Sequence, residues 1–282
     1  MTYKIGFMQG RLSPLVNGRI QAFPWDDWRA EFPAAAKIGL NRMEWTLDQE
    51  RLYENPLMTP SGQEEIRGLC RQHGFAIPSL TGDCFMQAPF WKANGQACAD
   101  LQRDFLAIGR ACAQAGIRMM VVPLVDNGRL DTPEQEDLLV SFLLEQRPFL
   151  TQHGLEVIFE SDYSPAELAR FIARLPADWF GINYDIGNSA ALGFDPAEEF
   201  AAYGERIVNV HVKDRLLGGT TVPLGTGNAD FDTVFSALAK AGYAGNYIMQ
   251  TARAGDGDHA GALTQYRQLI EGWIDRHRAH AA

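Results

Sequence analysis

Four polar side chains close short apolar segments in the second half of the sequence, and together they could bind a metal ion. They are Glu160 in "LEVIFE", Asp185 in "NYDIGN", His211 in "IVNVHV" and Gln250 in "NYIMQ". A polar group buried without a partner costs about 1–3 kcal/mol, so side chains at such positions need partners. Two carboxylates, one imidazole and one amide oxygen suit a divalent ion, with Mn²⁺ first and Mg²⁺, Co²⁺ or Zn²⁺ as alternatives. The competing interpretation is a plug of salt bridges without a metal.

The segments that would position these residues alternate between strand-like and helix-like patterns. The predicted strands are Lys4–Met8, Arg42–Trp45, Ala76–Leu80, Arg118–Pro123, Glu156–Glu160, Phe180–Asp185, Ile207–Val212 and Tyr247–Gln250. The predicted helices lie near Trp25–Ile38, Pro60–His73, Gln96–Ala115, Pro133–His153, Pro165–Leu175, Pro196–Tyr203, Phe231–Ala241 and Ala260–Arg276. Eight strand–helix repeats in about 250 residues predict one α/β domain over residues 1–282, a (β/α)₈ TIM barrel. The segment "MQGRLSP" has one glycine where a dinucleotide-binding turn needs three, which argues against a Rossmann fold.

In a TIM barrel the active site lies at the C-terminal ends of the strands, so the polar residues found there are further candidates. We expect substrate contacts from Gln9, Arg11, Glu44, Asp83, Asn188, Asp214, Arg215 and Arg253. Lys213 follows His211 by two residues and therefore points the same way along its strand, which makes it a candidate catalytic group beside Glu160.

Cationic side chains gather among these candidates although the chain carries a net charge of -10. Arg11, Lys213, Arg215 and Arg253 would all overhang the barrel mouth, and guanidinium groups bind phosphate or carboxylate in a bidentate way. We therefore expect a small carbohydrate substrate that is acidic or phosphorylated. The alternative is that each arginine pairs with a nearby aspartate.

Six motifs, taken in order, resemble the sugar isomerase and epimerase branch of the xylose isomerase-like TIM-barrel superfamily. They span nearly the whole chain and are "IGFMQGRLSP", "MEWTLD", "IFES", "YDIGN", "HVKDR" and "GYAGNYIMQ". The resemblance implies a metal-dependent isomerase or epimerase of a sugar or sugar phosphate. It also implies that Glu160, Asp185 and His211 are metal ligands, with Glu160 as the base that removes a proton α to a metal-bound carbonyl.

One position departs from that family pattern, because the fourth ligand is usually a glutamate and this chain has Gln250. An amide cannot accept a proton from the substrate, which favours chemistry with Glu160 as the single base. That chemistry is either aldose–ketose isomerisation or a lyase reaction, the dehydration or decarboxylation of an oxidised sugar or sugar acid. Epimerisation would need Glu44, Asp214 or a water on the opposite face. A non-enzymatic binding barrel is the remaining alternative.

Composition narrows the class of protein further. The acidic net charge repels phosphate backbones and anionic lipid, which argues against nucleic acid or membrane partners. The sequence shows neither a signal peptide nor an apolar run of about 18 residues, so we expect a cytoplasmic location. Its four cysteines lack the close spacing of a zinc knuckle and are expected to be reduced. The aromatic loop "GDCFMQAPFWKANGQ" predicts either a lid or a subunit interface, which leaves a homo-oligomer open.

Overall fold

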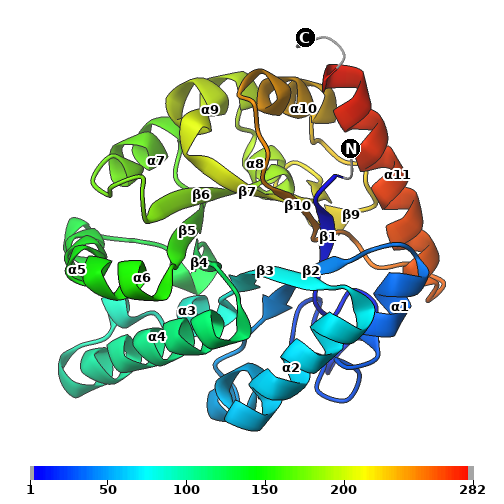
Figure 1. Ribbon diagram of the computed structural model, residues 1–282. Coiled ribbons are helices and arrows are strands. Elements are labelled where there is room, and N and C mark those ends of the chain that lie inside the picture. The colour runs from blue at the N-terminus through cyan, green and yellow to red at the C-terminus, as the bar shows by residue number, and fades with distance from the viewer. Residues whose placement is uncertain (1–2, 279–282) are drawn as a thin grey trace.

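A closed barrel of eight parallel strands forms the centre of the computed structural model, which describes residues 3–278 (Figure 1). The strands are β1 (Ile5–Met8), β2 (Arg42–Thr46), β3 (Ala76–Thr81), β4 (Met119–Leu124), β5 (Glu156–Ser161), β6 (Phe180–Asp185), β7 (Ile207–Val212) and β10 (Asn246–Met249). Around the barrel they follow the order β1-β10-β7-β6-β5-β4-β3-β2. The predicted (β/α)₈ fold is confirmed, and each predicted strand end lies within one residue of the observed one.

The outer layer consists of helices that follow the strands in the chain and cover the barrel from outside (Figure 1). The longer ones are α1 (Glu31–Lys37), α2 (Pro60–His73), α4 (Gly95–Ala115), α5 (Pro133–Glu145), α6 (Arg147–His153), α7 (Pro165–Ile172), α9 (Pro196–Tyr203), α10 (Phe231–Lys240) and α11 (His259–Arg278). Short 3₁₀ helices occupy Leu52–Glu54, Pro56–Met58, Phe90–Lys92, Asp126–Gly128 and Gly204–Arg206. Local caps stabilise several helix starts. At α7, for example, Ser164 and Glu167 form a reciprocal capping box.

Two predicted helices differ from the observed ones. The helix expected over Pro133–His153 is divided into α5 and α6, because Pro148 lacks an N–H and is accommodated only in the first turn of a helix. The helix expected over Trp25–Ile38 begins only at Glu31, and a series of turns precedes it. Two short helices were not predicted. They are α3 (Asp83–Gln87) and α8 (Ile186–Leu192), which directly follow β3 and β6.

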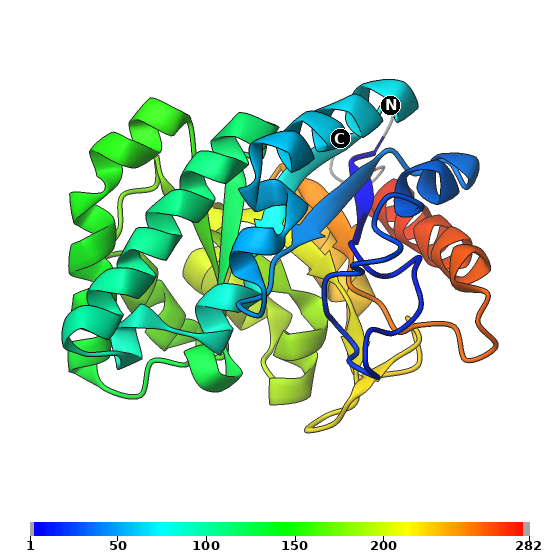
Figure 2. The same ribbon diagram turned by 90° about the horizontal axis from the view of Figure 1, so that it is seen from below.

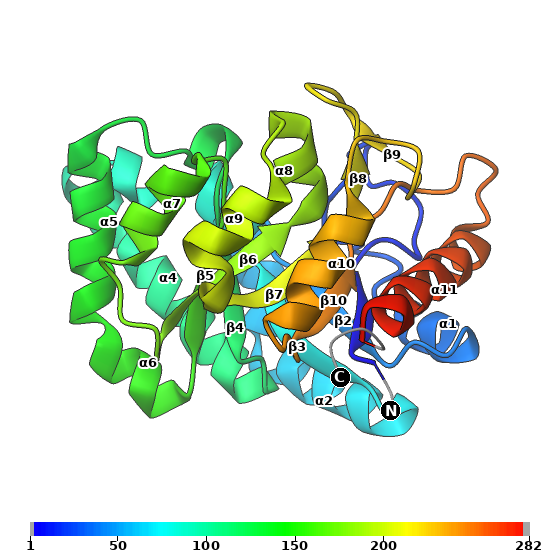
Figure 3. The ribbon, with the colours of Figure 1, turned by 90° about the horizontal axis from the view of Figure 1, so that it is seen from above.

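The C-terminal ends of the strands carry the additional elements. A two-stranded antiparallel hairpin of β8 (Asp214–Arg215) and β9 (Thr221–Val222) follows β7. Figure 3 shows this hairpin and α8 at one end of the barrel, while both termini lie at the opposite end. The long loop after β1 reaches the same end as the hairpin, as Figure 2 shows in blue and yellow. These segments stand over the strand ends that the sequence predicts to be functional.

The aromatic loop after β3 is neither a lid nor an exposed interface patch. Phe85, Phe90 and Trp91 are at most 6% exposed. Their rings pack into the helix layer, with the Phe90 ring centre 4.7 Å from that of Phe142 on α5. Burial of large aromatic surface is strongly favourable, and the gap between α4 and α5 supplies the partners. The loop is therefore part of the core, and only Met86 among its large apolar residues reaches the pocket described below.

Other expectations from composition concern the core, the thiols and membrane spans. Trp28 and Trp45 are buried in the core, and all four cysteines are free thiols, as expected. Within residues 3–278, no helix combines the length and the apolar character that crossing a lipid bilayer requires.

Candidate active site

Three of the predicted metal ligands meet at the C-terminal ends of three adjacent strands. Glu160 belongs to β5, Asp185 ends β6, and His211 lies near the end of β7. One ligand atom from each residue lies within 4.8 Å of the others, and all three side chains are buried. The His211 Nδ1 atom is 3.1 Å from Glu160 Oε2 and 3.9 Å from Asp185 Oδ2. Two carboxylates and an imidazole at this spacing can hold a divalent cation.

Glu44 sets the orientation of the His211 ring by contacting its Nε2 atom. The His211 Nε2 atom lies 2.7 Å from Glu44 Oε1, so that Nδ1 faces the other two carboxylates. Glu44 also accepts hydrogen bonds from Ser79, 2.6 Å away, and from Thr81. A carboxylate behind a histidine ligand is a common arrangement in metal sites, because it fixes the ring and makes the ligand nitrogen more basic. Glu44 is therefore placed to support a ligand rather than to touch a substrate.

The charges around His211 favour a cation at this point of the barrel. Burial lowers the pKa of the imidazole, but the charge of Glu44 and the hydrogen bonds to Glu160 and Glu44 outweigh burial and raise the pKa to about 10. Burial raises the pKa of Glu44, yet the His211 charge brings that pKa below its usual range. The surroundings thus stabilise one positive charge, whether it is a proton or a metal ion.

Lys213 connects Asp185 to Gln250. The Lys213 Nζ atom lies 2.7 Å from Asp185 Oδ2 and donates a hydrogen bond of 2.9 Å to Gln250 Oε1. Although the ammonium is close, Asp185 Oδ2 is buried and accepts no well-aligned hydrogen bond from any described residue. This oxygen can accept a further, better-aligned partner, as a metal ligand must. A glycine allows the contact, since a Cβ on Gly187 would lie 2.7 Å from the Lys213 Cγ.

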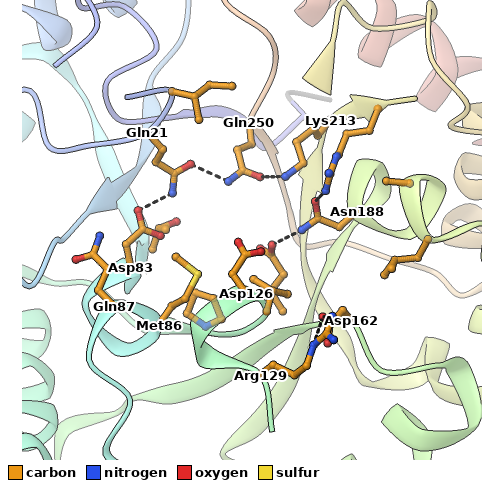
Figure 4. Close-up of a pocket in the computed structure, with 18 of the residues that line it drawn as sticks. Gln21, Asp83, Met86, Gln87, Asp126, Arg129, Asp162, Asn188, Lys213 and Gln250 are labelled. Atoms are coloured by element: carbon orange, nitrogen blue, oxygen red, sulfur yellow. Dashed lines mark hydrogen bonds and ion pairs between the residues drawn. The ribbon is translucent and has the colours of Figure 1, made fainter. Parts of the chain in front are cut away.

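A cavity of about 500 Å³ opens beside the cluster at the mouth of the barrel (Figure 4). Of the residues predicted for the site, it is lined by Asp83, Glu160, Asn188, Lys213, Arg215 and Gln250. Its wall also includes Met86 of the aromatic loop and Asp126 after β4, together with four residues that were not predicted as site residues: Gln21, Gln87, Arg129 and Asp162. The cavity is large enough for a small sugar derivative.

Two predicted arginines lie outside this cavity, in the loops behind its wall. Arg11 donates from Nε to the Thr251 carbonyl, 3.1 Å away, and from a terminal nitrogen to the Ile20 carbonyl at 3.0 Å. Arg253 donates to the carbonyl of Ser13. Both guanidinium groups therefore satisfy backbone oxygens and join loops, and they do not project over the mouth as the sequence suggested.

Three other predicted residues are fully buried and also absent from the cavity wall: Gln9, Glu44 and Asp214. The Gln9 amide oxygen accepts from the Thr46 N–H at 3.1 Å. Asp214 accepts backbone hydrogen bonds from Gly225 and Gly227 at 2.9 and 2.8 Å, which shapes the loop after β9. Substrate contact by these residues is not supported, because each one is committed to a neighbour inside the protein.

Arg215 is the predicted guanidinium that does reach the cavity. It donates to the Asn188 Oδ1 atom at 2.9 Å and to the Gly219 carbonyl at 2.7 Å, both neutral oxygens. Asn188 in turn donates to Glu160 Oε1 at 2.6 Å. The other arginine of the wall, Arg129, is paired with the carboxylate of Asp162. Arg215 thus keeps a positive charge that no carboxylate among the described residues neutralises.

Gln21 is the pocket residue that the sequence gave least reason to suspect, because it lies in the loop after β1 and belongs to no motif. It accepts from Gln250 Nε2 at 2.8 Å and donates to Asp83 Oδ2 at 2.7 Å. Asp162 could have been found, since it follows Glu160 by two residues and extends the same strand end. The spacing rule that selected Lys213 after His211 would have selected it too.

Comparison with known proteins agrees with this geometry. The family described as xylose isomerase-like TIM barrels matches residues 32–277. The chain is 41% identical over 73 residues to L-ribulose-5-phosphate 3-epimerase UlaE of Salmonella paratyphi A, a match that covers 26% of each protein. It is 35% identical over 94 residues to UlaE of Escherichia coli, which covers 33% of each. The matches thus span a quarter to a third of these curated relatives.

Solved structures resemble the chain over nearly its full length. A structure titled IOLI protein with a binding zinc atom has a TM-score of 0.77 at 16% identity and covers 97% of this chain and 99% of that one. A structure of L-ribulose 3-epimerase has a TM-score of 0.75 at 15% identity, with coverage of 99% and 97%. At such identities the likeness shows the fold. Because the family match extends over most of the sequence and the barrel agrees with it, this chain belongs to the xylose isomerase-like TIM-barrel family.

Proposed function

We propose that this protein is a divalent-metal-dependent isomerase or epimerase of a sugar or sugar phosphate, with Glu160 as the base that acts next to the substrate carbonyl. The observation that carries the proposal is the cluster of Glu160, Asp185 and His211 beside a cavity of about 500 Å³. The partial matches to L-ribulose-5-phosphate 3-epimerases support the reaction class.

The residues present fit a metal ion, with Mn²⁺ as the first choice for this mixed oxygen and nitrogen set. Glu160, Asp185 and His211 would hold it, and Asp185 Oδ2 has no well-aligned hydrogen bond from a described residue to give up. When bound, such an ion acts as a Lewis acid that polarises a carbonyl and stabilises developing negative charge. Gln250 stays our proposal for a fourth ligand, although its amide oxygen accepts from Lys213 in this structure.

Glu160 is positioned for proton transfer by its neighbours. Its Oε1 atom accepts from Asn188, while Oε2 faces His211 and the Asn183 amide at 3.2 Å. The side chain is buried but lines the cavity, so its carboxylate can reach a carbon held there. Lys213 lines the same wall and can donate a hydrogen bond to a substrate oxygen.

The substrate class that we propose is a phosphorylated or acidic ketose. Of the four cations expected at the mouth, two line the cavity, Lys213 and Arg215. Lys213 is already beside Asp185, whereas Arg215 contacts neutral oxygens only and can pair with an anionic group. The names of the UlaE relatives, which are phosphopentose epimerases, support the same assignment.

A lyase is the second candidate, and the amide at position 250 favours it. An amide cannot exchange a proton with the substrate, so a single base at Glu160 would suit the loss of water or carbon dioxide as well as isomerisation. The two candidates share the metal ligands and the base. They differ in their products, because an isomerase or epimerase keeps every carbon and oxygen atom of the substrate, whereas the lyase releases water or carbon dioxide.

The test follows hydrogen exchange at the substrate carbon. Protein loaded with Mn²⁺ is incubated in deuterated water with ketopentose 5-phosphates and their unphosphorylated forms, and deuterium next to the carbonyl is measured by NMR. We expect incorporation that chelation abolishes and Mn²⁺ restores. Glu160→Gln should reduce it by about 10²–10⁴-fold, the usual contribution of a general base.

Glu156→Gln is the matched control, because Glu156 is on the same strand at its other end and outside the cavity. It should exchange at the wild-type rate. Release of water or carbon dioxide would establish the lyase. If no substrate exchanges and no metal binds, the protein is a binding barrel and the proposal is refuted.

A further inference from the structure

Epimerisation requires a proton donor on the substrate face away from Glu160, and the residues first considered for that role cannot reach the cavity. Glu44 and Asp214 are both fully buried and hydrogen-bonded inside the protein. Gln250 lines the cavity, but its amide acts neither as an acid nor as a base at neutral pH. If the enzyme is an epimerase, the proton on that face comes from a water or from a second titratable group of the cavity wall.

Asp83 is a carboxylic acid of the same cavity wall. It is the first residue of α3, directly after β3, and β3 is separated from the β5 strand of Glu160 by β4. Its side chain lines the same cavity as Glu160 although the residue is only 6% exposed. The Oδ2 atom accepts from Gln21 at 2.7 Å, while Oδ1 has no hydrogen-bond partner among residues 3–278. One oxygen is thus held and the other is available to a substrate.

A directed chain of hydrogen bonds positions this carboxyl group (Figure 4). Lys213 donates to Gln250 at 2.9 Å, Gln250 donates to Gln21 at 2.8 Å, and Gln21 donates to Asp83 at 2.7 Å. Every donor points from the ammonium toward the carboxyl group. A glutamate at position 250 would place a carboxylate oxygen against the Gln21 amide oxygen. Two acceptors cannot form a hydrogen bond, so the chain would be broken there. The glutamine is therefore explained by the position of Asp83.

Burial also keeps a proton available on Asp83. Burial raises the pKa of this carboxyl group to about 7, and the charges of Asp48 and Glu160 act in the same direction. The hydrogen bond from Gln21 and the charge of Arg11 oppose the rise. A raised pKa favours the protonated form of Asp83, which can act as an acid, whereas a carboxyl group in water would be almost fully ionised at neutral pH.

We propose that Asp83 is the second proton-transfer residue of the site, which replaces the glutamate that is missing at position 250, and that Gln21 positions it. Ionised Glu160 removes the proton on one face, and the C–H electron pair moves onto the carbonyl oxygen. Protonated Asp83 then delivers its proton to the other face as the carbonyl re-forms. Glu160 ends protonated and Asp83 ionised, and exchange with solvent restores both. This inference rests on the proposed isomerase or epimerase function.

Asp126 is the rival carboxylate, since it lines the same cavity. It is exposed, its backbone has a positive φ of 49°, and its carboxylate has no hydrogen-bond partner among residues 3–278. A proton donor must be held within a narrow geometry to be effective. Asp83 meets that requirement through Gln21, so Asp126→Asn serves as the matched control.

The experiment compares epimer formation with hydrogen exchange in Asp83→Asn, Asp126→Asn and wild-type protein. Each is loaded with Mn²⁺ and given a ketopentose 5-phosphate in deuterated water, and fold and metal content are verified by circular dichroism and elemental analysis. We expect Asp83→Asn to lose at least about 10²-fold in epimerisation while the proton that faces Glu160 still exchanges. Asp126→Asn tests the rival carboxylate, and it should keep the wild-type ratio of epimerisation to exchange.

A second variant separates positioning from proton transfer. Gln21→Leu keeps the carboxyl group but removes its donor, and we expect about a tenfold lower ratio of epimerisation to exchange. If Asp83→Asn does not fold, the ratio measured in Gln21→Leu still tests the inference. An unchanged ratio in Gln21→Leu would contradict the positioning role.

The remaining outcomes overturn the inference in distinguishable ways. Epimerisation at the wild-type rate in Asp83→Asn would exclude Asp83 as the proton donor. Loss of both exchange and epimerisation in folded, metal-loaded Asp83→Asn would show that Asp83 does not act on a single face of the substrate. Wild-type protein that exchanges and isomerises without ever forming an epimer refutes this inference but leaves the proposed function intact. No exchange with any substrate refutes the proposed function itself.

Discussion

The two arcs of the barrel mouth are built differently. In the arc of β5, β6 and β7, polar residues at the strand ends form the candidate metal cluster, and one of them, Glu160, lines the cavity. In the arc of β1 and β2, the strand-end residues Gln9 and Glu44 are completely buried below the cavity. Loops and the short helix α3 lie above this second arc and supply the wall in their place.

The difference shows that a residue at the C-terminal end of a barrel strand does not necessarily line the pocket. After β6 the chain turns at once into α8, so Asp185 stays close to the cavity. After β1, residues 9–30 form a long loop that covers the strand end and contributes Gln21 to the wall. The first arc therefore holds the proposed metal, and the second arc presents the substrate with groups that the loops bring in.

The largest effect is expected from the aromatic loop after β3, next to the second arc. Phe90→Ala should lower the free energy of unfolding by about 3–5 kcal/mol, because the ring is buried against Phe142 and Trp91 and a cavity would remain. Chemical denaturation measures the change. Met86→Ala, a half-buried neighbour that lines the pocket, should cost less stability and alter KM instead. Normal stability with lost activity in Phe90→Ala would restore the lid interpretation.

A smaller effect is expected from Glu44, which lies in the second arc and contacts His211 of the first arc. Glu44→Gln is expected to weaken Mn²⁺ binding by about 10–100-fold, because the charge behind His211 Nε2 is lost. Isothermal titration calorimetry with Mn²⁺ measures it. Glu31→Gln is the control, since Glu31 is a buried glutamate of α1 that accepts from the backbone of Gly10 and Leu12 and does not contact His211. Equal affinities in both variants would mean that Glu44 does not act through the proposed metal site.

The smallest effect concerns the anion site at the rim. Arg215→Leu should raise KM for a phosphorylated ketose about fivefold and leave KM for the unphosphorylated sugar unchanged, because a solvent-facing ion pair contributes up to about 1 kcal/mol. Arg129→Leu, which removes an arginine already paired with Asp162, should change KM less. An equal rise for both sugars in Arg215→Leu would argue against recognition of phosphate.

The amino-acid sequence by itself determined the barrel and its candidate metal residues. Short apolar strand-like segments that alternate with helix-like segments are local signals, and they placed every barrel strand end within one residue. The same local logic identified Glu160, Asp185 and His211, because each closes an apolar strand whose partner strands follow in order along the chain.

Only the tertiary structure decided how deeply each strand-end side chain is buried and which paths the loops take. Glu44 and Glu160 both lie on barrel strands, but the stagger of the closed sheet pairs Glu44 with Met8 and Ser79 in the interior and leaves Glu160 at the rim. The contact of Gln21 with Asp83 and Gln250 joins segments far apart in sequence through a loop without periodicity. Local patterns define which elements form, whereas the packing of those elements against one another decides which side chains face the same cavity.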